Sequence, residues 1–201
     1  MVEWTLYSCG EKMRNVTMLR SDIFIDNVGT EEQRQELKNT IFNFKNTHDS
    51  MANSNDGCWR GDVQFDNMNW LEEAIIKRLE QVINFYLNED ASYAQRYNPQ
   101  AQYVESWVNV NESGSSNRIH AHSDYDFVAL YFIQGTDTGS LTMHNPANLL
   151  HNCSLNSPFV SRYSFDPKDG DLYIWPAWMP HEVEINNSER QRINITFNIK
   201  V

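Results

Sequence analysis

The second half of the chain alternates polar and apolar residues over short segments, and this pattern constrains the fold more than any other feature. The clearest segment is RINITFNIK at 192–200, where Ile193, Ile195 and Phe197 alternate with polar side chains. Successive side chains of a β-strand point to opposite faces, so we predict a strand with one apolar and one polar face. If helices cover the apolar face, the polar face lines the interior, where buried charges need partners. The pattern therefore indicates an interior that holds an anionic ligand.

Eight short segments that are expected to be extended follow one another from residue 103 onward. They read YVESWVNVN, RIHAHSD, FVALYFIQ, GSLTMHN, RYSFDP, GDLYIWP, HEVEIN and RINITFNIK. Turn signals such as Lys168-Asp169-Gly170 separate several of them. Eight short strands with such spacing favour a jelly roll or a barrel. We predict one α+β domain over 1–201, in which 1–100 are mainly helical and 101–201 form the jelly-roll core.

Two helices are expected in the first half, packed on one sheet of the jelly roll. Thr30 followed by Gln33 resembles a capping box, and helical spacing of apolar residues continues to about Lys45. A longer apolar stripe predicts a second helix from about Asn69 to Leu87. Between them, the segment ANSNDGCWRGD at 52–62 has two glycines and is interpreted as a loop.

Charge and cysteine content exclude several classes of protein. The net charge is −11, which disfavours binding to nucleic acid because the phosphate backbone would be repelled. The three cysteines, Cys9, Cys58 and Cys153, form neither a disulfide framework nor a CxxC site. No apolar run approaches the length of a membrane span. We expect a cytoplasmic protein without a membrane partner, and the oligomeric state stays open.

A cluster of metal-ligating residues begins one of the expected strands. His120, His122 and Asp124 are spaced two apart, so in a strand they would share one face. Neighbouring members would be ~6.5 Å apart and could share a metal, whereas His120 and Asp124 would be ~13 Å apart. The pattern therefore allows either His120 with His122 or His122 with Asp124 as a ligand pair.

His181 is the candidate third ligand, because it begins the segment HEVEIN and points inward with Val183. Two histidines and one carboxylate with open positions are typical of non-haem Fe(II) oxygenases. Three histidines around the metal would be the cupin-like variant. A carboxylate is the commoner second ligand for this chemistry, so Asp124 is preferred to His120.

A 2-oxo acid bound to Fe(II) would need a cation for its distal carboxylate. Arg192 lies eleven residues after His181, on the next strand, and faces inward. Arginine can form a bidentate pair with a carboxylate. Asn194 projects to the same side, and Tyr131 is a further candidate donor of a hydrogen bond.

These residues, in this order, resemble the 2-oxoglutarate/Fe(II)-dependent dioxygenases. More narrowly, HAHSDYDFVALYFI, GSLTMHNP, GDLYIWPAWMPHEVEIN and RINITFN are similar to a branch found in bacteria and in tailed phages of marine bacteria. The resemblance covers roughly the last 100 residues. It implies a double-stranded β-helix, Fe(II) and 2-oxoglutarate as cofactors, O₂ as co-substrate, and hydroxylation of a small molecule or peptide. It also implies the bacterial cytoplasm, or that of an infected host.

Two other classes of function stay open. One is a cupin-like metal dioxygenase with three histidines and no oxoacid, which would bind iron without needing Arg192. The other is a non-catalytic jelly-roll module, such as a virion or carbohydrate-binding part, which would bind no stoichiometric iron. The sequence does not identify the substrate.

Overall fold

A computed structural model describes residues 22–51, 55–62, 65–89, 102–146 and 161–201. The two expected helices are present as α1 (Glu31–Lys45) and α2 (Asn69–Glu89), and a short 3-10 helix, η1 (Asp66–Met68), precedes α2. The capping box is confirmed: the Thr30 hydroxyl accepts from the Gln33 backbone, and the Gln33 side chain accepts from the Thr30 backbone. These two hydrogen bonds satisfy backbone amide groups that the N-terminus of a helix otherwise leaves without partners.

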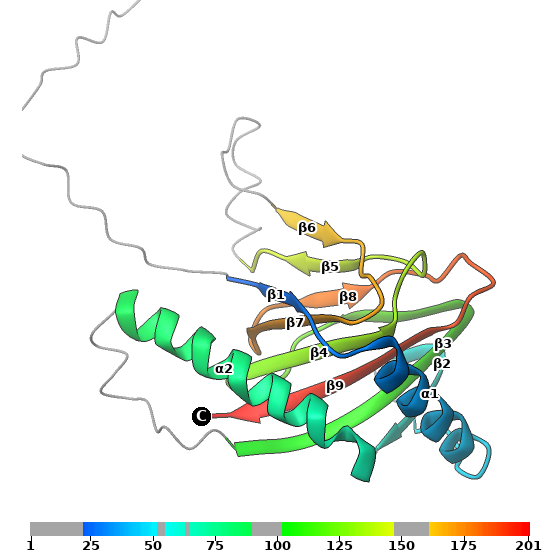
Figure 1. Ribbon diagram of the computed structural model, residues 1–201. Coiled ribbons are helices and arrows are strands. Elements are labelled where there is room, and N and C mark those ends of the chain that lie inside the picture. The colour runs from blue at the N-terminus through cyan, green and yellow to red at the C-terminus, as the bar shows by residue number, and fades with distance from the viewer. Residues whose placement is uncertain (1–21, 52–54, 63–64, 90–101, 147–160) are drawn as a thin grey trace, which may run out of the picture.

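The strands of the described residues form one antiparallel sheet that curls over on itself (Figure 1). Their order is β1-β7-β4-β9-β3-β8-β5-β6, and β2 pairs with β3. Their bounds are β1 Phe24–Asn27, β2 Asn55–Asp62, β3 Gln102–His120, β4 Phe127–Gln134, β5 Leu141–His144, β6 Arg162–Phe165, β7 Asp171–Pro176, β8 His181–Val183 and β9 Arg192–Lys200.

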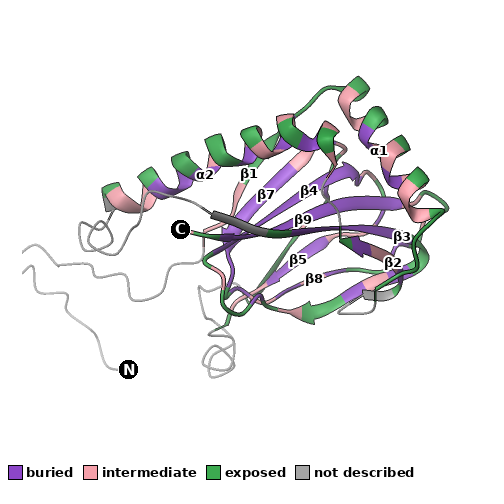
Figure 2. Cartoon of the chain, turned by 90° about the horizontal axis from the view of Figure 1, so that it is seen from below, coloured by how far each residue is buried: buried purple, intermediate pink, exposed green. Residues whose placement is uncertain are grey.

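The curled sheet makes two layers, and the helices cover the outside of one of them (Figure 2). The first core lies between the helices and the layer β7-β4-β9-β3, with residues such as Leu37, Leu79 and Ile195. The second core lies between the layers and includes Leu130 and Trp175. Because each strand of the middle layer has one face toward each core, the predicted jelly roll with helices on one sheet is confirmed.

Two expected boundaries are wrong. Residues 55–62 form strand β2 instead of a loop, because they pair with β3, and Gly57 with its φ of 69° lies at a break in that register. The two strands expected at 103–111 and 118–124 are one strand, β3, which ends at His120. Gly114, with a φ of 84°, lies where β3 changes partners from β9 to β8, as is typical of a glycine at an irregular position.

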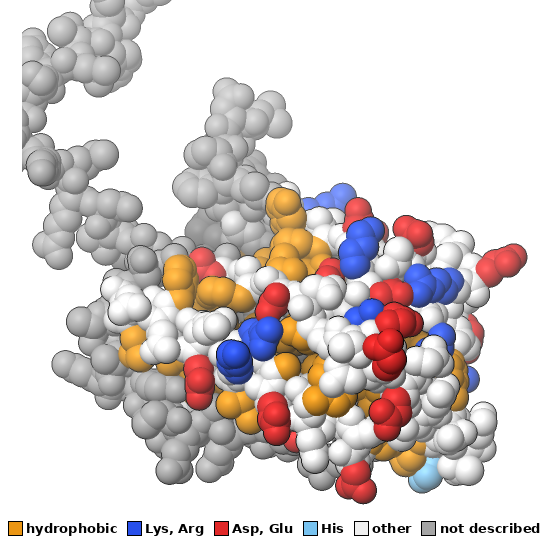
Figure 3. All heavy atoms as spheres, in the orientation of Figure 1, with side chains coloured by type: hydrophobic (Ala, Val, Ile, Leu, Met, Phe, Trp, Pro, Cys, Tyr) orange, Lys and Arg blue, Asp and Glu red, His pale blue; other side chains and the backbone are white. Residues whose placement is uncertain are grey.

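One face of the molecule carries side chains of both signs of charge. On the face shown in Figure 3, aspartate and glutamate side chains alternate with lysine and arginine side chains and leave no broad patch of one sign. None of the helices in the described ranges is long and apolar enough to cross a membrane.

Candidate metal and oxoacid site

Three histidines come together where β3 and β8 meet. His120 ends β3 and pairs in register with His181, the first residue of β8. His122 follows two residues later, and its backbone amide donates to the Ala177 carbonyl. One ring nitrogen from each histidine lies within 4.8 Å of the others, the only such group of metal-ligating residues in the described part of the chain.

Hydrogen bonds to the Nδ1 atoms orient all three imidazoles. His120 Nδ1 lies 2.6 Å from the Arg118 carbonyl, and His181 Nδ1 lies 3.1 Å from the Met179 carbonyl. His122 Nδ1 lies 2.6 Å from Oδ1 of Asn198, whose amide group donates to a Glu105 carboxylate oxygen at 2.7 Å. Since these partners are acceptors, each Nδ1 carries the proton and each Nε2 presents a lone pair.

The free lone pairs of His122 and His181 face each other, with their Nε2 atoms 3.3 Å apart. Two facing lone pairs repel unless a cation lies between them. Two imidazole nitrogens that each lie ~2.1 Å from one ion, at an angle near 100°, are about 3.2 Å apart. The donor set therefore fits a metal ion, and the acceptors on Nδ1 are the outer partners that metal-binding histidines usually have.

Burial keeps these rings neutral and ready to bind a metal. Burial, with smaller contributions from the neighbouring His120 and Arg60, lowers the pKa of His122 to about 4, although the hydrogen bond with Asn198 opposes the shift. Burial also lowers the pKa of His181 well below its usual value and, to a smaller degree, that of His120. A neutral imidazole is the form that coordinates a metal, so the site is competent at neutral pH.

Asp124 lies outside this cluster. The strand ends at His120, and Asp124 is an exposed residue in the following turn, with a φ of 71°. The period-two spacing that would place it beside His122 therefore stops four residues before it. Of the two ligand pairs that the sequence allows, the fold brings together His120 and His122.

The polar face of β9 leads away from the histidines. Asn198, Thr196, Asn194 and Arg192 alternate along it, and all four are buried. Asn198 holds His122, and Arg192 is at the far end of the strand. Arg192 Nη1 donates to the Glu184 carbonyl at 2.8 Å, three residues beyond His181, so the guanidinium lies ~10 Å along this segment from the histidine backbone.

Arg192 is a buried cation with unused hydrogen-bonding capacity. It is fully buried, and burial lowers its pKa to about 10. Nη1 donates to the carbonyls of Thr138 and Glu184, but Nε and Nη2 have no partner. No ion pair within the described ranges includes Arg192. A buried unpaired charge is costly, so this arrangement fits a carboxylate ligand.

The other two predicted oxoacid contacts lie in different places. Asn194 lines the same interior, accepts from Asn109 at 3.0 Å, and has an unpartnered amide nitrogen. Tyr131 lies on the opposite face of the sheet, under the helices, where its hydroxyl donates to the Val28 carbonyl at 3.1 Å. It packs edge-to-face on Trp70 and does not share the face of Arg192.

A pocket connects the histidines with the polar face of β9. Its lining includes the three histidines, Asn109, Asn194 and Thr196, with Trp107 and Trp175 as aromatic walls. Trp107 stacks on His122 at a centroid distance of 5.8 Å, and Trp175 contacts His181 at 4.9 Å. A larger cavity between β1 and α2, lined by Phe24 and Phe85, contains no histidine. We therefore assign the site to the histidine pocket.

Residues 105–198 match the family model described as "putative 2OG-Fe(II) oxygenase". The matched region contains every histidine of the cluster and the whole polar face of β9. The jelly roll of this chain is therefore similar to the 2OG-Fe(II) oxygenases over these residues. This match confirms the resemblance that the sequence motifs indicated.

Solved structures share the fold of this chain at low identity. A prolyl-4-hydroxylase from Pseudomonas putida is 14% identical, with 89% of this chain and 91% of that chain covered and a TM-score of 0.58. The viral collagen prolyl hydroxylase of Paramecium Bursaria Chlorella virus-1 is 10% identical, with 90% and 96% covered and a TM-score of 0.56. HygX from Streptomyces hygroscopicus, solved with nickel and 2-oxoglutarate, is 9% identical, with 90% and 83% covered and a TM-score of 0.57. No curated protein matches the sequence.

Two residues of the site, Asn198 and Trp107, are not predicted from the sequence. Asn198 orients His122, and its place on the polar face of RINITFNIK was a usable signal. Trp107 forms a wall of the pocket, but an isolated tryptophan in an expected strand carries no sign of its neighbours.

Proposed function

We propose that the chain is a 2-oxoglutarate- and Fe(II)-dependent dioxygenase that hydroxylates a small molecule or a peptide. The observation that carries this proposal is the presence of two incomplete groups at opposite ends of the polar face of β9, which lines the histidine pocket through Asn194 and Thr196. At one end, neutral histidines present facing lone pairs; at the other, Arg192 has two buried donors without partners. A metal ion satisfies the first group and a dicarboxylate of suitable length satisfies the second.

His122, His181 and His120 would hold Fe(II), and Asp124 is the alternative third ligand that the sequence favours. Arg192 would anchor the distal carboxylate of 2-oxoglutarate, with a hydrogen bond from the unpartnered amide of Asn194. We do not expect Tyr131 to contribute, because its hydroxyl is engaged beneath the helices. We also propose that both halves act as one domain, since β1 and β2 pair with strands of the jelly roll.

Fe(II) and 2-oxoglutarate, when bound, supply O₂ activation and the oxidation of a C–H bond, with loss of CO₂ from the oxoacid. The residues of the chain provide orientation and shielding. Asn198 and the carbonyl acceptors fix the imidazole planes, and Arg192 fixes the direction of the oxoacid. The walls formed by Trp107 and Trp175 would limit the access of bulk water, which protects a reactive site from side reactions.

The deciding experiment is an anaerobic titration of the purified protein with Fe(II) and then 2-oxoglutarate. A visible charge-transfer band that saturates at one equivalent is expected, because the oxoacid chelates the iron. Iron binding without the band would instead support the cupin-like three-histidine dioxygenase. Absence of iron binding would support the non-catalytic jelly-roll module.

Single substitutions separate the two assignments of the third ligand. His120→Ala should weaken iron binding strongly and Asp124→Asn should leave it unchanged if the three histidines bind the metal. The reverse result would restore Asp124 as the ligand. His181→Ala should abolish stoichiometric iron in either case, and unchanged iron content in that variant would refute the whole metal assignment.

A further inference from the structure

Strand β2 adds a second arginine to the interior of the jelly roll. Arg60 lies directly opposite Asn109 of β3 in the register, and Asn109 points into the pocket. Directly opposed residues of an antiparallel pair share a face, so Arg60 lies on the pocket side. Because β3 pairs with β2 along one edge and with β9 along the other, Arg60 and Arg192 are on opposite sides of β3.

Arg60 is close to the proposed metal ligands. Its guanidinium carbon lies 4.2 Å from the centre of the Trp107 ring, and Trp107 is stacked on His122 with an interplanar angle of 13°. The positive charge of Arg60 also helps to lower the pKa of His120 and of His122. The guanidinium is therefore within electrostatic reach of both rings.

The guanidinium of Arg60 is poorly satisfied in spite of its burial. The side chain is 12% exposed, and Nε is buried without a hydrogen-bond partner. Its acidic neighbour within the described ranges is Asp62, whose Oδ1 lies 3.6 Å from Nη2 and whose side chain is 55% exposed. That distance is longer than a hydrogen bond, and an exposed pair contributes little.

The charge balance of the pocket points to an anionic substrate. The three histidines are neutral ligands, so the two charges of a bound Fe(II) would be balanced by the two carboxylates of 2-oxoglutarate. Arg192 and Arg60 then remain as positive charges. The nearby carboxylates are Asp62, the weak partner of Arg60, and the exposed Glu105, which accepts from Asn198. In a chain with a net charge of −11, two arginines on the pocket side of the sheet attract and orient an anion.

We propose that Arg60 binds an oxyanion of the primary substrate, a carboxylate or a phosphate group, beside the metal. This inference rests on the proposed function and names the class of substrate: an anionic small molecule or an acidic peptide. Trp107 holds the guanidinium plane and leaves its edge available for the paired hydrogen bonds that arginine forms with oxyanions.

The test is a calorimetric titration of the metal-free protein with inorganic phosphate and, separately, with acetate. It uses an Arg192→Gln background, so that neither probe reports on the oxoacid anchor. Arg60→Met should weaken binding by about 10- to 100-fold, the loss expected for a charge-assisted hydrogen bond. The probe that binds more tightly identifies the oxyanion as phosphate or carboxylate.

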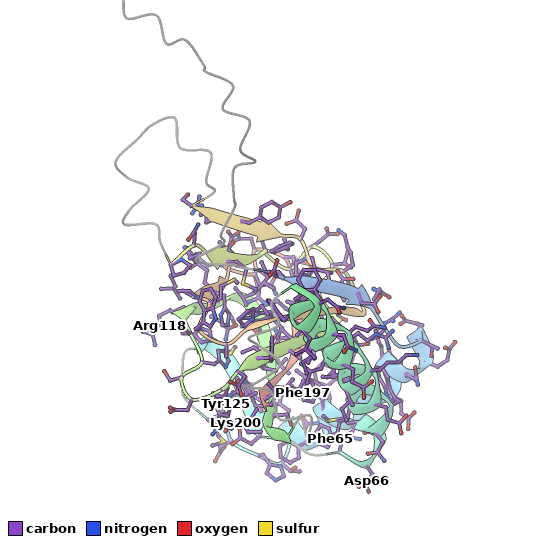
Figure 4. All side chains as sticks on the ribbon, turned by 90° about the vertical axis from the view of Figure 1, so that its left-hand side faces the viewer. Phe65, Asp66, Arg118, Tyr125, Phe197 and Lys200 are labelled. Carbon is purple, nitrogen blue, oxygen red and sulfur yellow. The ribbon has the colours of Figure 1, made fainter. Side chains whose placement is uncertain are left out.

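Arg118→Gln is the matched control, because it removes the same charge from an exposed arginine near His120. Arg118 lies at the edge of the molecule (Figure 4), and phosphate binding should not change in this variant. Equal binding in Arg60→Met and its parent would overturn the inference, as would an equal loss in Arg118→Gln. If Arg60→Met fails to fold, Arg60→Lys keeps the charge without the fork and should still weaken binding severalfold; unchanged binding there would also overturn the inference.

A second readout separates this inference from the proposed function. With Arg192 intact, Arg60→Met should keep the anaerobic charge-transfer band at an unchanged concentration of 2-oxoglutarate. A weaker band would place Arg60 in the oxoacid site and overturn its assignment to the substrate. If the parent protein shows no band but the calorimetric loss is present, the oxygenase proposal fails while the oxyanion site stands.

Discussion

Replacement of Arg192 by glutamine tests the oxoacid anchor most directly. In the parent, Nε and Nη2 of Arg192 are free to donate to a carboxylate, and Gln removes both donors and the charge. Each charge-assisted hydrogen bond contributes roughly 1.5–3 kcal/mol, so two of them are worth about 3–6 kcal/mol. The dissociation constant for 2-oxoglutarate should therefore rise by at least about 100-fold, while iron affinity changes little.

Thermal unfolding of the anaerobic Fe(II) protein measures this loss. At 2-oxoglutarate 100 times above the parent dissociation constant, binding stabilises the parent by about 2.7 kcal/mol. For a chain of this size that corresponds to a rise in Tm of roughly 5–11 °C. In Arg192→Gln the same concentration gives about 0.4 kcal/mol, or roughly 1–2 °C.

Tyr131→Phe is the control for this measurement, because the hydroxyl of Tyr131 donates to the Val28 carbonyl beneath the helices. It should lower the Tm of the free protein but leave the rise caused by 2-oxoglutarate intact. The reasoning is refuted if Arg192→Gln keeps the full rise in Tm, or if Tyr131→Phe loses it.

Three further predictions concern residues around the site. Asn198→Ala removes the acceptor of His122 Nδ1 and should weaken metal binding by about 10- to 100-fold in a chelator competition assay; unchanged affinity would contradict the bracing role. The pKa of His122 is lowered to about 4 in the folded protein, so the unfolded state takes up a proton first as the pH falls. Protonation therefore favours unfolding, and the metal-free protein should lose about 3 kcal/mol of unfolding free energy between pH 6.5 and 4. Urea unfolding across that range should show a shallower pH dependence in His122→Gln, and an identical dependence would exclude His122 as the cause. Gly139→Ala places a Cβ about 3.0 Å from Arg192 Nη1 and should weaken 2-oxoglutarate binding, whereas Gly114→Ala, also at positive φ but with nothing within 4 Å, should affect stability alone.

The elements with a clear periodic pattern could be predicted from the sequence. Both helices follow from the apolar spacing and the Thr30 cap, and the inward face of β9 follows from strict alternation. Arg192 is buried as that alternation requires. Strand β2 could not be predicted, because its glycines resemble a turn and its pairing with β3 depends on residues far away in the sequence.

The sequence could not predict which face of the sheet Tyr131 takes, nor that Asp124 lies away from His122. The reasons for the two residues differ. Strand β4 is buried along its whole length, so its run of apolar residues has no alternation to show which face each residue takes. For Asp124, a period of two applies only while the strand continues, and β3 ends at His120. The local sequence does not mark this end, because the turn residues Ser123 and Asp124 are themselves polar.

The alternation along β9 also decides which changes of length the protein can tolerate. Deletion of one residue within β9 would turn its polar set, Asn194, Thr196 and Asn198, toward the helices and its isoleucines toward the histidines. Such a change would destroy the core and the pocket at once, whereas many single substitutions on either face would damage only one of them. Related chains can therefore vary in the residues of this strand, but insertions and deletions should be confined to the loops that flank it.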